Sequence, residues 1–581
     1  MEHAFTRRVT LTLGTGMATL LAGCGHLAEP LHTPTQSGSR GPLIDAHCHL
    51  FNASDLSAIR FLKIVFIGLH PPSSNKLLGV EDPDIVDALL ALFVVVFAGR
   101  APSAQAEINH LRNFGDAELA SVAALNASND AIENDLASFL RAPPQKLGLR
   151  PTEVIAQARV RSAILVAGGQ RAGSNSLKSM SQDTAMSIAK GALNSKFDIG
   201  TYLRWFRLFS RFRFQLVDEL TSYHRTQGYE PALLTPAMVD YARWLLETPK
   251  SPLGEQVDVF TEIAKRPGKT AVHGYVAYDP LHQVYLEMDR KPKSMSNAQW
   301  ALEKSETPLQ IVERALTSGG FLGVKLYPPM GFRATHNADL PALDFPDQVT
   351  DDLGLDSREL GLKLDGALAK LYDLCVRPDI DAPIMAHGGE GNEANKDYGK
   401  RADPYYWWDV AKNWPKLRIS LAHFGGFKYQ TAGPAGPQPP PLNKAWEMVI
   451  GRFVAANPGH PLFADLSYLS EVFNASASVK AKHAAYFKAY AQLDPKFEHI
   501  IFGTDWIMLG NINGSDSYAG QIGDFLRNDC RLNDDQFANV MWRNAVRFLG
   551  LRPGSSTRAR LDRFYLSHGL DKSRLSAFDL A

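Results

Sequence analysis

The stretch Asp45-Ala46-His47-Cys48-His49-Leu50-Phe51 (DAHCHLF) closes the first apolar, strand-like run of the chain, Leu43–His49. Side chains alternate faces along a strand, so His47 and His49 point to one face and Cys48 points to the other. Two imidazoles on one face of a strand end can bind one divalent metal, and zinc suits such ligands. Two histidines alone are too few for a tight site, and an ordinary surface or core pair explains their spacing better.

The same arrangement recurs at three later points of the chain. Each of three polar residues ends an apolar, strand-like run and precedes glycines or a turn: His387, His423 and Asp505. In a parallel barrel the carboxyl ends of the strands meet on one face, so these side chains can converge with the two histidines of the first strand. Singly, each is explained by a structural histidine or an N-cap aspartate. Their recurrence in this order favours a metal site.

The alternation of strand-like and helical runs predicts an α/β fold. The candidate strands are Leu43–His49, Ser162–Ala167, Ala271–Ala277, Leu322–Tyr327, Pro383–His387, Arg418–His423, Pro461–Leu466 and His499–Thr504, with helices such as Arg358–Cys375 and Val472–Leu493. Eight parallel strands are the number that closes a (β/α)8 TIM barrel. The connections after the first two runs are too long for plain loops. We therefore expect a barrel over 43–555, large helical insertions at about 52–160 and 170–270, and a C-terminal extension, 556–581.

Composition places the chain among ordinary globular proteins. Of its 581 residues, 45% are hydrophobic and 21% are charged, which excludes a disordered chain, a collagen-like fibre and a coiled coil. Lys and Arg together number 61, as do Asp and Glu, so the overall charge gives no reason to bind nucleic acid. Four cysteines in so long a chain do not make a disulfide framework.

The N-terminus has the parts of an export signal. Arg7 and Arg8 precede the uncharged apolar run Val9–Ala22, which is shorter than the roughly 20 residues of a membrane-spanning helix. The run ends in Leu-Ala-Gly before Cys24, which resembles the bacterial lipobox, although an ordinary cleavage site is the alternative. We expect a signal peptide at 1–23 and a flexible tether at 24–42 that begins with a lipidated Cys24. The lipid would anchor the protein on the periplasmic side of a bacterial membrane, and we expect this to be the outer membrane.

Longer pieces of the chain resemble the amidohydrolase superfamily, specifically the amidohydrolase family 2 branch that includes the aminocarboxymuconate-semialdehyde decarboxylase group. The matching pieces are DAHCHLF (45–51), AYDP (277–280), GVKLYPPMGF (323–332), IMAHGGEGN (384–392), LAHFGG (421–426), FADLSY (463–468), FGTDW (502–506) and NAVRFLGL (544–551). They run through the expected barrel but not through the two inserts. The set is specific for the branch and uninformative about the substrate.

The resemblance implies a mononuclear site whose metal ligands are His47, His49, His387 and Asp505. It places His423 beside the metal, where it helps to activate a water molecule. A divalent ion, for which zinc is the best candidate, lowers the pKa of that water toward neutrality. A neutral imidazole can hold or pass on the proton near pH 7, and Asp505 can both bind the metal and accept a proton.

Two cations lie within or after the fourth candidate strand, Leu322–Tyr327, and each has more than one possible role. Lys325 could be carbamylated and bridge a second metal, could meet an anionic group of the substrate, or could pair with a structural carboxylate. Arg333 could grip a substrate carboxylate with its planar guanidinium, or could be an exposed loop residue.

The sequence thus predicts a metal-dependent hydrolase that cleaves a C–N or C–O bond of a small molecule, in an amide, lactone or ester. Non-oxidative decarboxylation of an aromatic or unsaturated carboxylic acid is the alternative, since the branch includes decarboxylases with much the same ligands. A third reading, from the lipid anchor and the large inserts, is a non-catalytic surface binding lipoprotein. Nothing in the sequence decides between a monomer and a homo-oligomer.

Overall fold

The computed structural model describes residues 40–66, 93, 97–113, 199–341, 345–427, 445–473 and 475–580. It divides into two compact units, of which the larger holds Pro34–Ser57, Ser103–Asn113 and Phe212–Ala581. The expected signal peptide, Cys24 and the candidate strand Ser162–Ala167 lie outside the described residues. In the described part of the chain, no helix is both long enough and apolar enough to cross a membrane.

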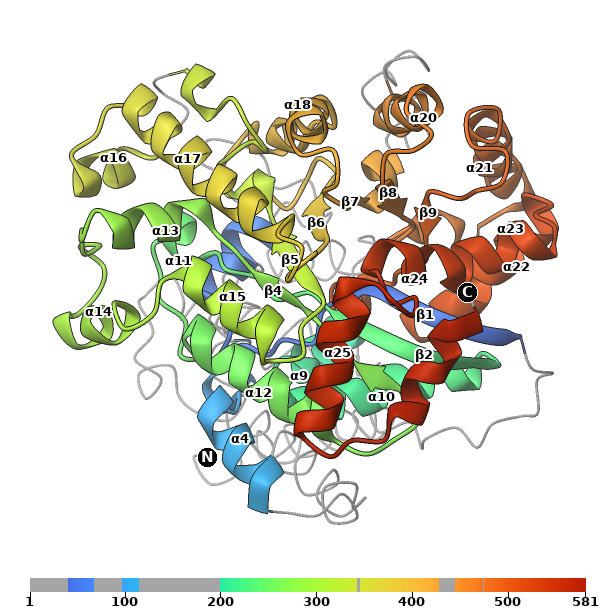
Figure 1. Ribbon diagram of the computed structural model, residues 1–581, viewed down its shortest axis with the longest axis horizontal. Helices are drawn as coiled ribbons and strands as arrows, with labels where there is room; N and C mark the ends of the chain where they lie inside the picture. Colours follow the sequence, from blue (N-terminus) through green and yellow to red (C-terminus); the bar gives the residue numbers. More distant parts are fainter. Residues whose placement is uncertain are drawn as a thin grey trace, which may run out of the picture. The chain divides into compact units, whose positions relative to one another are not determined.

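The larger unit is built on two parallel sheets (Figure 1). One sheet holds β1 (Gly41–Cys48), β2 (Tyr229–Pro236) and β3 (Ala271–Val272), and the other holds β4 (Tyr275–Ala277), β5 (Gly323–Leu326), β6 (Ile384–His387), β7 (Ile419–Ala422), β8 (Leu462–Asp465) and β9 (Ile500–Ile501), each in chain order. A parallel bridge between Ala237 and Tyr275 links the two sheets. At the other end, the amide of Ala46 donates to the carbonyl oxygen of Phe502 at 3.1 Å. The expected α/β fold with parallel strands is confirmed.

The strand predictions are confirmed at β1 and from β3 to β9. The strand that pairs with β1 is β2, which lies within the range expected to be an insert, 170–270. The predicted strand Ala271–Ala277 is split into β3 and β4 around Gly274. An added Cβ at Gly274 would lie 2.5 Å from the carbonyl oxygen of Pro236, so only glycine lets the chain pass this close to the end of β2.

Helices surround the strands of this unit (Figure 1). Among the described residues they are α4 (Ala104–Asn113), α10 (Arg213–Thr226), α11 (Ala242–Leu245), α12 (Leu253–Lys265), α13 (Pro280–Glu287), α14 (Asn297–Glu303), α15 (Pro308–Thr317), α16 (Asp347–Leu353), α17 (Ser357–Cys375), α18 (Tyr405–Asn413), α20 (Trp446–Ala456), α21 (Ala477–Tyr490), α22 (Tyr518–Asp524), α23 (Asp534–Ala538), α24 (Asn544–Leu549) and α25 (Ser556–Ser567). Both predicted helices are present, as α17 and α21. Helix α17 starts where Asp356 and Glu359 form a capping box, which satisfies otherwise unpaired amides of its first turn.

The C-terminal segment covers the amino ends of strands. Arg560 in α25 is 3% exposed and donates to four backbone carbonyls that precede β5 and β6, those of Leu316, Phe321, Leu322 and Ile380. Phe564 and Tyr565 of the same helix belong to a buried cluster with Ile44 and Ala46 of β1. This edge of the sheet is therefore closed by packing, and the opposite edge, at the carboxyl ends of the strands, remains for a functional site.

Buried ion pairs hold helices α4 and α10 to the segment that follows β1. The guanidinium of Arg213 in α10 donates to Glu107 in α4 at 2.8 Å and to Asp55, which follows β1, at 2.8 Å. All three side chains are at most 1% exposed. The two carboxylates share one cation, so α4 and α10 are held to the segment after β1 by the same three groups.

The smaller unit holds Met1–Thr33, Ala58–Pro102 and Phe114–Arg211. Its described elements are α2 (Ala58–Arg60), the π-helical turn η1 (Phe61–Phe66), the 3-10 turn η3 (Ala98–Arg100) and α9 (Ile199–Leu208). Phe93 contacts Phe206 and Phe209, with ring centroids 5.0 and 5.5 Å apart, and Trp205 packs edge-on against Phe209 at 4.9 Å. Aromatic packing thus forms the described core of this unit.

Candidate metal centre

Polar side chains from the carboxyl ends of the strands gather at one edge of the sheets. They are His47 and His49 at and after β1, Lys325 in β5, His387 ending β6, His423 after β7, Asp465 ending β8 and Asp505 after β9. Each is at most 9% exposed. Buried ionisable groups are retained only when they are paired or bind an ion, so a cluster of this size marks a functional site.

One compact group consists of His47, His49 and Asp505. The Asp505 Oδ1 atom lies 3.1 Å from His49 Nε2 and 3.4 Å from His47 Nε2. One donor atom from each of the three residues lies within 4.8 Å of the other two, a spacing that one metal ion can span. Two imidazole nitrogens and a carboxylate are a ligand set typical of zinc.

The rings of His47 and His49 are oriented by acceptors on their far sides. His49 Nδ1 lies 2.7 Å from the carbonyl oxygen of Ala237, which can only accept, so Nδ1 carries the hydrogen. His47 Nδ1 lies 3.0 Å from Asp465 Oδ2. A carboxylate oxygen can also only accept, so this Nδ1 carries the hydrogen as well. Both rings therefore present the lone pair of Nε2 toward Asp505, which is the arrangement that metal-binding histidines require.

The protonation states also suit a metal. Burial, together with the charge of Lys325, lowers the pKa of His47 to about 4. Burial likewise lowers the pKa of His387 and of His423, so these imidazoles are neutral at pH 7. Burial alone would raise the pKa of Asp505, but the neighbouring histidines hold it at about 2, and the group is a carboxylate. Metal ligands must be deprotonated, and His47, His387 and Asp505 meet this requirement.

His387 and His423 form a second imidazole pair beside this group. His423 Nδ1 lies 3.3 Å from the carbonyl oxygen of Ser467, so it carries the hydrogen and Nε2 has the lone pair. That Nε2 lies 3.1 Å from His387 Nδ1. The contact is a hydrogen bond when one nitrogen is protonated, and it is also the spacing of two nitrogens on one ion, since Zn–N bonds of about 2.0–2.1 Å put neighbouring ligand atoms roughly 3 Å apart.

Sequence reasoning missed two residues that lie between these pairs. Asp465 forms a second compact group with His47 and His423. Ser467 Oγ lies 2.9 Å from His47 Nδ1 and 3.0 Å from His423 Nδ1. A signal was present, because Asp465 is the one charged residue of the strand-like run Pro461–Leu466, next to its end, in a piece already matched to the family, FADLSY (463–468).

Asp45, the first residue of the opening motif, is also part of the support. Its carboxylate accepts from the amide of Thr504 at 3.1 Å and from the Thr504 hydroxyl at 2.8 Å. His224 Nε2 lies 3.1 Å from the same carboxylate. Asp45 thereby fixes the segment that carries Asp505 against the strand that carries His47.

The sequence also matches a known family. Residues 257–551, half of the chain, match the family model described as amidohydrolase, Amidohydro_2. The chain belongs to the amidohydrolase family. Members of this family bind a metal ion, and they include both hydrolases and decarboxylases. The matched range contains His387, His423 and Asp505 and begins after His47 and His49.

Solved structures of both reaction types resemble this amidohydrolase at low identity. A protein described as a metal-dependent hydrolase from Lactobacillus casei ATCC 334 is 13% identical, with 88% of this chain and 96% of that chain covered and a TM-score of 0.36. The 5-carboxyvanillate decarboxylase of Sphingomonas paucimobilis is 12% identical (59% and 84% covered, TM-score 0.32). A protein described as a 2-pyrone-4,6-dicarboxylic acid hydrolase from Acinetobacter baumannii is 10% identical (58% and 88%, 0.29). No curated protein matches the sequence.

The two cations considered from the sequence differ in their placement within the amidohydrolase. Lys325 is 2% exposed, and its Nζ lies 3.1 Å from His47 Nε2. Burial lowers the pKa of this ammonium to about 8. Arg333 instead stacks over the ring of Tyr406, with 4.6 Å from Cζ to the ring centroid, and donates to the carbonyl oxygen of His336 at 3.4 Å. Lys325 thus belongs to the cluster. None of the described contacts of Arg333 is with a histidine of the cluster.

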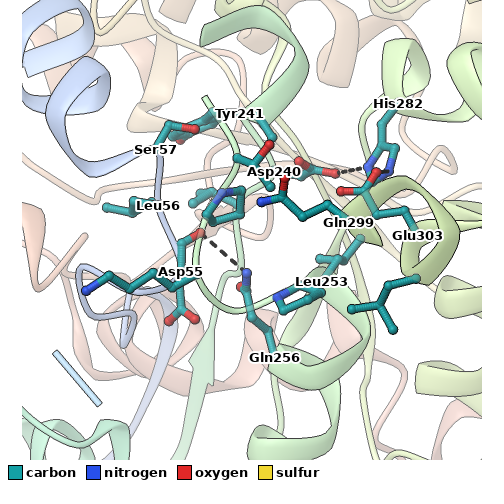
Figure 2. Close-up of a pocket in the computed structure, with 17 residues that line it drawn as sticks. Asp55, Leu56, Ser57, Asp240, Tyr241, Leu253, Gln256, His282, Gln299 and Glu303 are labelled. Atoms are coloured by element: carbon teal, nitrogen blue, oxygen red, sulfur yellow. Dashed lines mark hydrogen bonds and ion pairs between the residues drawn. The ribbon is translucent and has the colours of Figure 1, made fainter. Parts of the chain in front are cut away.

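A cavity of about 180 Å³ is lined by residues that include Asp55, Tyr241 and His282 (Figure 2). One of its lining residues, Tyr241, packs edge-on against Tyr327 at 5.1 Å between centroids, and Tyr327 stacks on His387 at 4.3 Å. In Figure 2 the Asp240 carboxylate points at the His282 ring, and the two are 2.6 Å apart. Tyr327 therefore links one residue of the cavity wall to His387.

Proposed function

We propose that this amidohydrolase is a metal-dependent hydrolase that cleaves a C–N or C–O bond, as in an amide, lactone or ester, of a small molecule. The observation that carries the proposal is the group of His47, His49 and Asp505, in which both Nδ1 atoms are occupied and both Nε2 lone pairs face one carboxylate. The proposed scaffold is a (β/α)8 barrel with insertions, in which the backbone contact between β1 and Phe502 closes the ring of strands.

The residues that would hold the ion are His47, His49, His387 and Asp505. Donor atoms of three of them, His47, His49 and Asp505, lie close enough together to share one divalent ion, and zinc suits nitrogen donors with a carboxylate. When bound, such an ion supplies a strong positive charge and a water whose pKa is lowered toward neutrality. A second ion enters the proposal only if Lys325 is carbamylated.

The remaining groups would handle protons and the substrate. Because the Ser467 carbonyl fixes the hydrogen of His423 on Nδ1, only Nε2 of that ring can take up and release a proton. Asp505 has a second carboxylate oxygen for the same purpose. The Lys325 ammonium lies among the ligands, where it can bind an anionic oxygen of the substrate or of the developing product.

Decarboxylation is the second candidate, and Lys325 is the observation that favours it. A buried ammonium beside the ligands suits a substrate carboxylate, and the family includes decarboxylases. The two reactions are separated by their products. Release of carbon dioxide from aromatic or unsaturated carboxylic acids, with C–N and C–O bonds intact, would replace the hydrolase proposal by the decarboxylase.

The decisive first experiment is the divalent metal content of the purified full-length chain. We expect about one zinc per chain in the wild type and none in a His47→Ala/His49→Ala double variant. His336→Ala, on a half-exposed histidine outside the cluster, is the matched control and should keep the metal. Two equivalents would favour a bridging, carbamylated Lys325. A folded protein that binds no added zinc would overturn the proposal in favour of a non-catalytic surface binding lipoprotein.

We also propose that the chain is exported, lipidated at Cys24 and anchored on the periplasmic side of a bacterial membrane. The proposal is supported by the apolar run Val9–Ala22, which leads into the sequence Leu-Ala-Gly-Cys. Cell fractionation tests it. Cys24→Ala should move the protein from the membrane fraction to the soluble fraction, and an unchanged membrane fraction would refute the anchor.

A further inference from the structure

We infer that Asp465 is a positioning residue that sets the tautomer of His47 and so makes its Nε2 available to a metal. The inference rests on the proposed metal site. Asp465 and His47 are both fully buried, and Asp465 Oδ2 lies 3.0 Å from His47 Nδ1. A buried carboxylate at this distance keeps the hydrogen on Nδ1, because it can only accept.

The second carboxylate oxygen of Asp465, Oδ1, already accepts hydrogen bonds from other groups. Oδ1 accepts from the backbone amide of His423 at 3.0 Å, from the backbone amide of Ser467 at 3.0 Å, and from the Ser467 hydroxyl. Three donors converge on this one atom, so the carboxylate cannot rotate without breaking them. Oδ2 is therefore the oxygen that must face His47.

The same contacts extend to the second imidazole pair. His423 has a positive φ of 63°, a conformation that non-glycine residues adopt rarely, and its amide is held by Asp465. Ser467, held by Asp465, places its carbonyl and hydroxyl oxygens against His423 Nδ1. Asp465 thus orients one ring directly and the other through Ser467.

This geometry makes Asp465→Asn a directional test. The amide oxygen of the new side chain must take the Oδ1 position, where three donors point at it. The amide nitrogen then takes the Oδ2 position and faces His47 Nδ1 with a hydrogen. Donor meets donor there, which favours the His47 tautomer with its hydrogen on Nε2, the atom that would bind the metal. The Ser467 hydroxyl oxygen, 2.9 Å from Nδ1, is then the remaining acceptor for a hydrogen on that nitrogen.

The experiment measures zinc affinity of the full-length chain by competition with a chromogenic chelator. Removing an outer partner of a metal ligand typically weakens affinity about 10- to 100-fold, and we expect a loss of this size for Asp465→Asn. Ser467→Ala removes the hydroxyl that lies 2.9 Å from His47 Nδ1 but leaves Oδ2 in place, so it should weaken the affinity less than Asp465→Asn does. Asp494→Asn is the matched control, because Asp494 is a buried aspartate that accepts only from neighbouring groups before β9.

Histidine ring ¹⁵N resonances of the metal-free protein report the tautomer independently of affinity. In the wild type His47 should carry its hydrogen on Nδ1, and in Asp465→Asn on Nε2. The inference is overturned if wild-type His47 is protonated on Nε2, or if Asp465→Asn binds zinc as tightly as the wild type. It is also overturned if Asp494→Asn loses as much affinity. Failure of the wild type to bind zinc would refute the proposed metal site instead.

Discussion

His49 Nδ1 lies 2.7 Å from the carbonyl oxygen of Ala237, a residue 188 positions further along the chain. Ala237 directly follows β2, whose Pro236 is in register with Cys48 of β1. The amide of Ala237 in turn donates to the carbonyl oxygen of Cys48 at 2.7 Å. The direction of one proposed metal ligand is therefore set by the neighbouring strand and not by the motif that contains the ligand.

Close approach between the first and last strands should make Gly503 irreplaceable. A Cβ added there would lie 2.7 Å from His47 Cβ and 3.1 Å from the His47 amide nitrogen, so Gly503→Ala must displace the strand that carries the ligand. We expect a loss of about 1–3 kcal/mol in the free energy of unfolding and at least tenfold weaker zinc binding. Urea unfolding and chelator competition measure the two effects.

Gly366 in α17 is the matched control for that substitution. An added Cβ at this position meets nothing within 4 Å, so Gly366→Ala should stabilise the helix by up to about 1 kcal/mol and leave zinc binding unchanged. Equal zinc affinity in both variants would show that the contact between Gly503 and His47 does not position the ligand.

Removal of the Lys325 ammonium should strengthen metal binding. Its Nζ lies 3.1 Å from His47 Nε2, so a cation there repels a divalent ion in the cluster. We expect Lys325→Met to keep one zinc per chain and to bind it about tenfold more tightly. Lys370→Met, at an exposed lysine paired with Glu287, is the control and should change nothing. Weaker binding in Lys325→Met would instead identify the lysine as a carbamylated ligand.

The parts of the site that the sequence predicts are those encoded locally. His387 and Asp505 each end a short apolar run, and this pattern placed them at the same edge as the histidines of β1. Strand β2, with the sequence YEPALLTP, contains two prolines and a glutamate, so its pattern does not predict a buried strand. Its role depends on pairing with β1, which no local pattern records.

Long-range contacts also set features of the site that no local pattern records. The local sequence around Asp465 is that of an ordinary strand end. Its contact with His47, 418 residues away in the chain, is visible only in the folded structure. Arg333 follows β5 as a substrate-binding arginine would, yet its guanidinium stacks on Tyr406. The direction of a long side chain is set by the neighbours it meets, and these neighbours come from distant segments.

The buried ion cluster of the first insert should be a large contributor to stability. Glu107→Ala removes one of two carboxylates from Arg213, which is fully buried, and also removes the acceptor of the Phe214 amide. Breaking a buried pair on one side typically costs about 3–5 kcal/mol, and we expect this loss in urea unfolding. Arg112→Ala breaks an exposed pair of the same helix with Glu262 and should cost at most about 1 kcal/mol. Equal effects of the two substitutions would contradict the prediction.

His282 in the cavity wall should make stability depend on pH. Its Nδ1 lies 2.6 Å from Asp240 and its Nε2 lies 3.3 Å from Glu303, which also pairs with Arg243. Burial opposes the charged ring, but the Asp240 carboxylate outweighs it and raises the pKa of His282 to about 9. The folded protein therefore holds this proton more tightly than the unfolded chain. The resulting stability is fully present below pH of about 6.5 and is lost as the pH rises through about 9.

Substitution of the ring isolates this contribution. At about 1.4 kcal/mol per pKa unit, the shift of His282 corresponds to roughly 3 kcal/mol. The free energy of unfolding of the wild type should therefore fall by roughly this amount, relative to His282→Gln, between pH 6 and pH 9.5. Urea unfolding at the two pH values measures the difference, and parallel pH profiles for the two proteins would show that the proton is not held by this cluster.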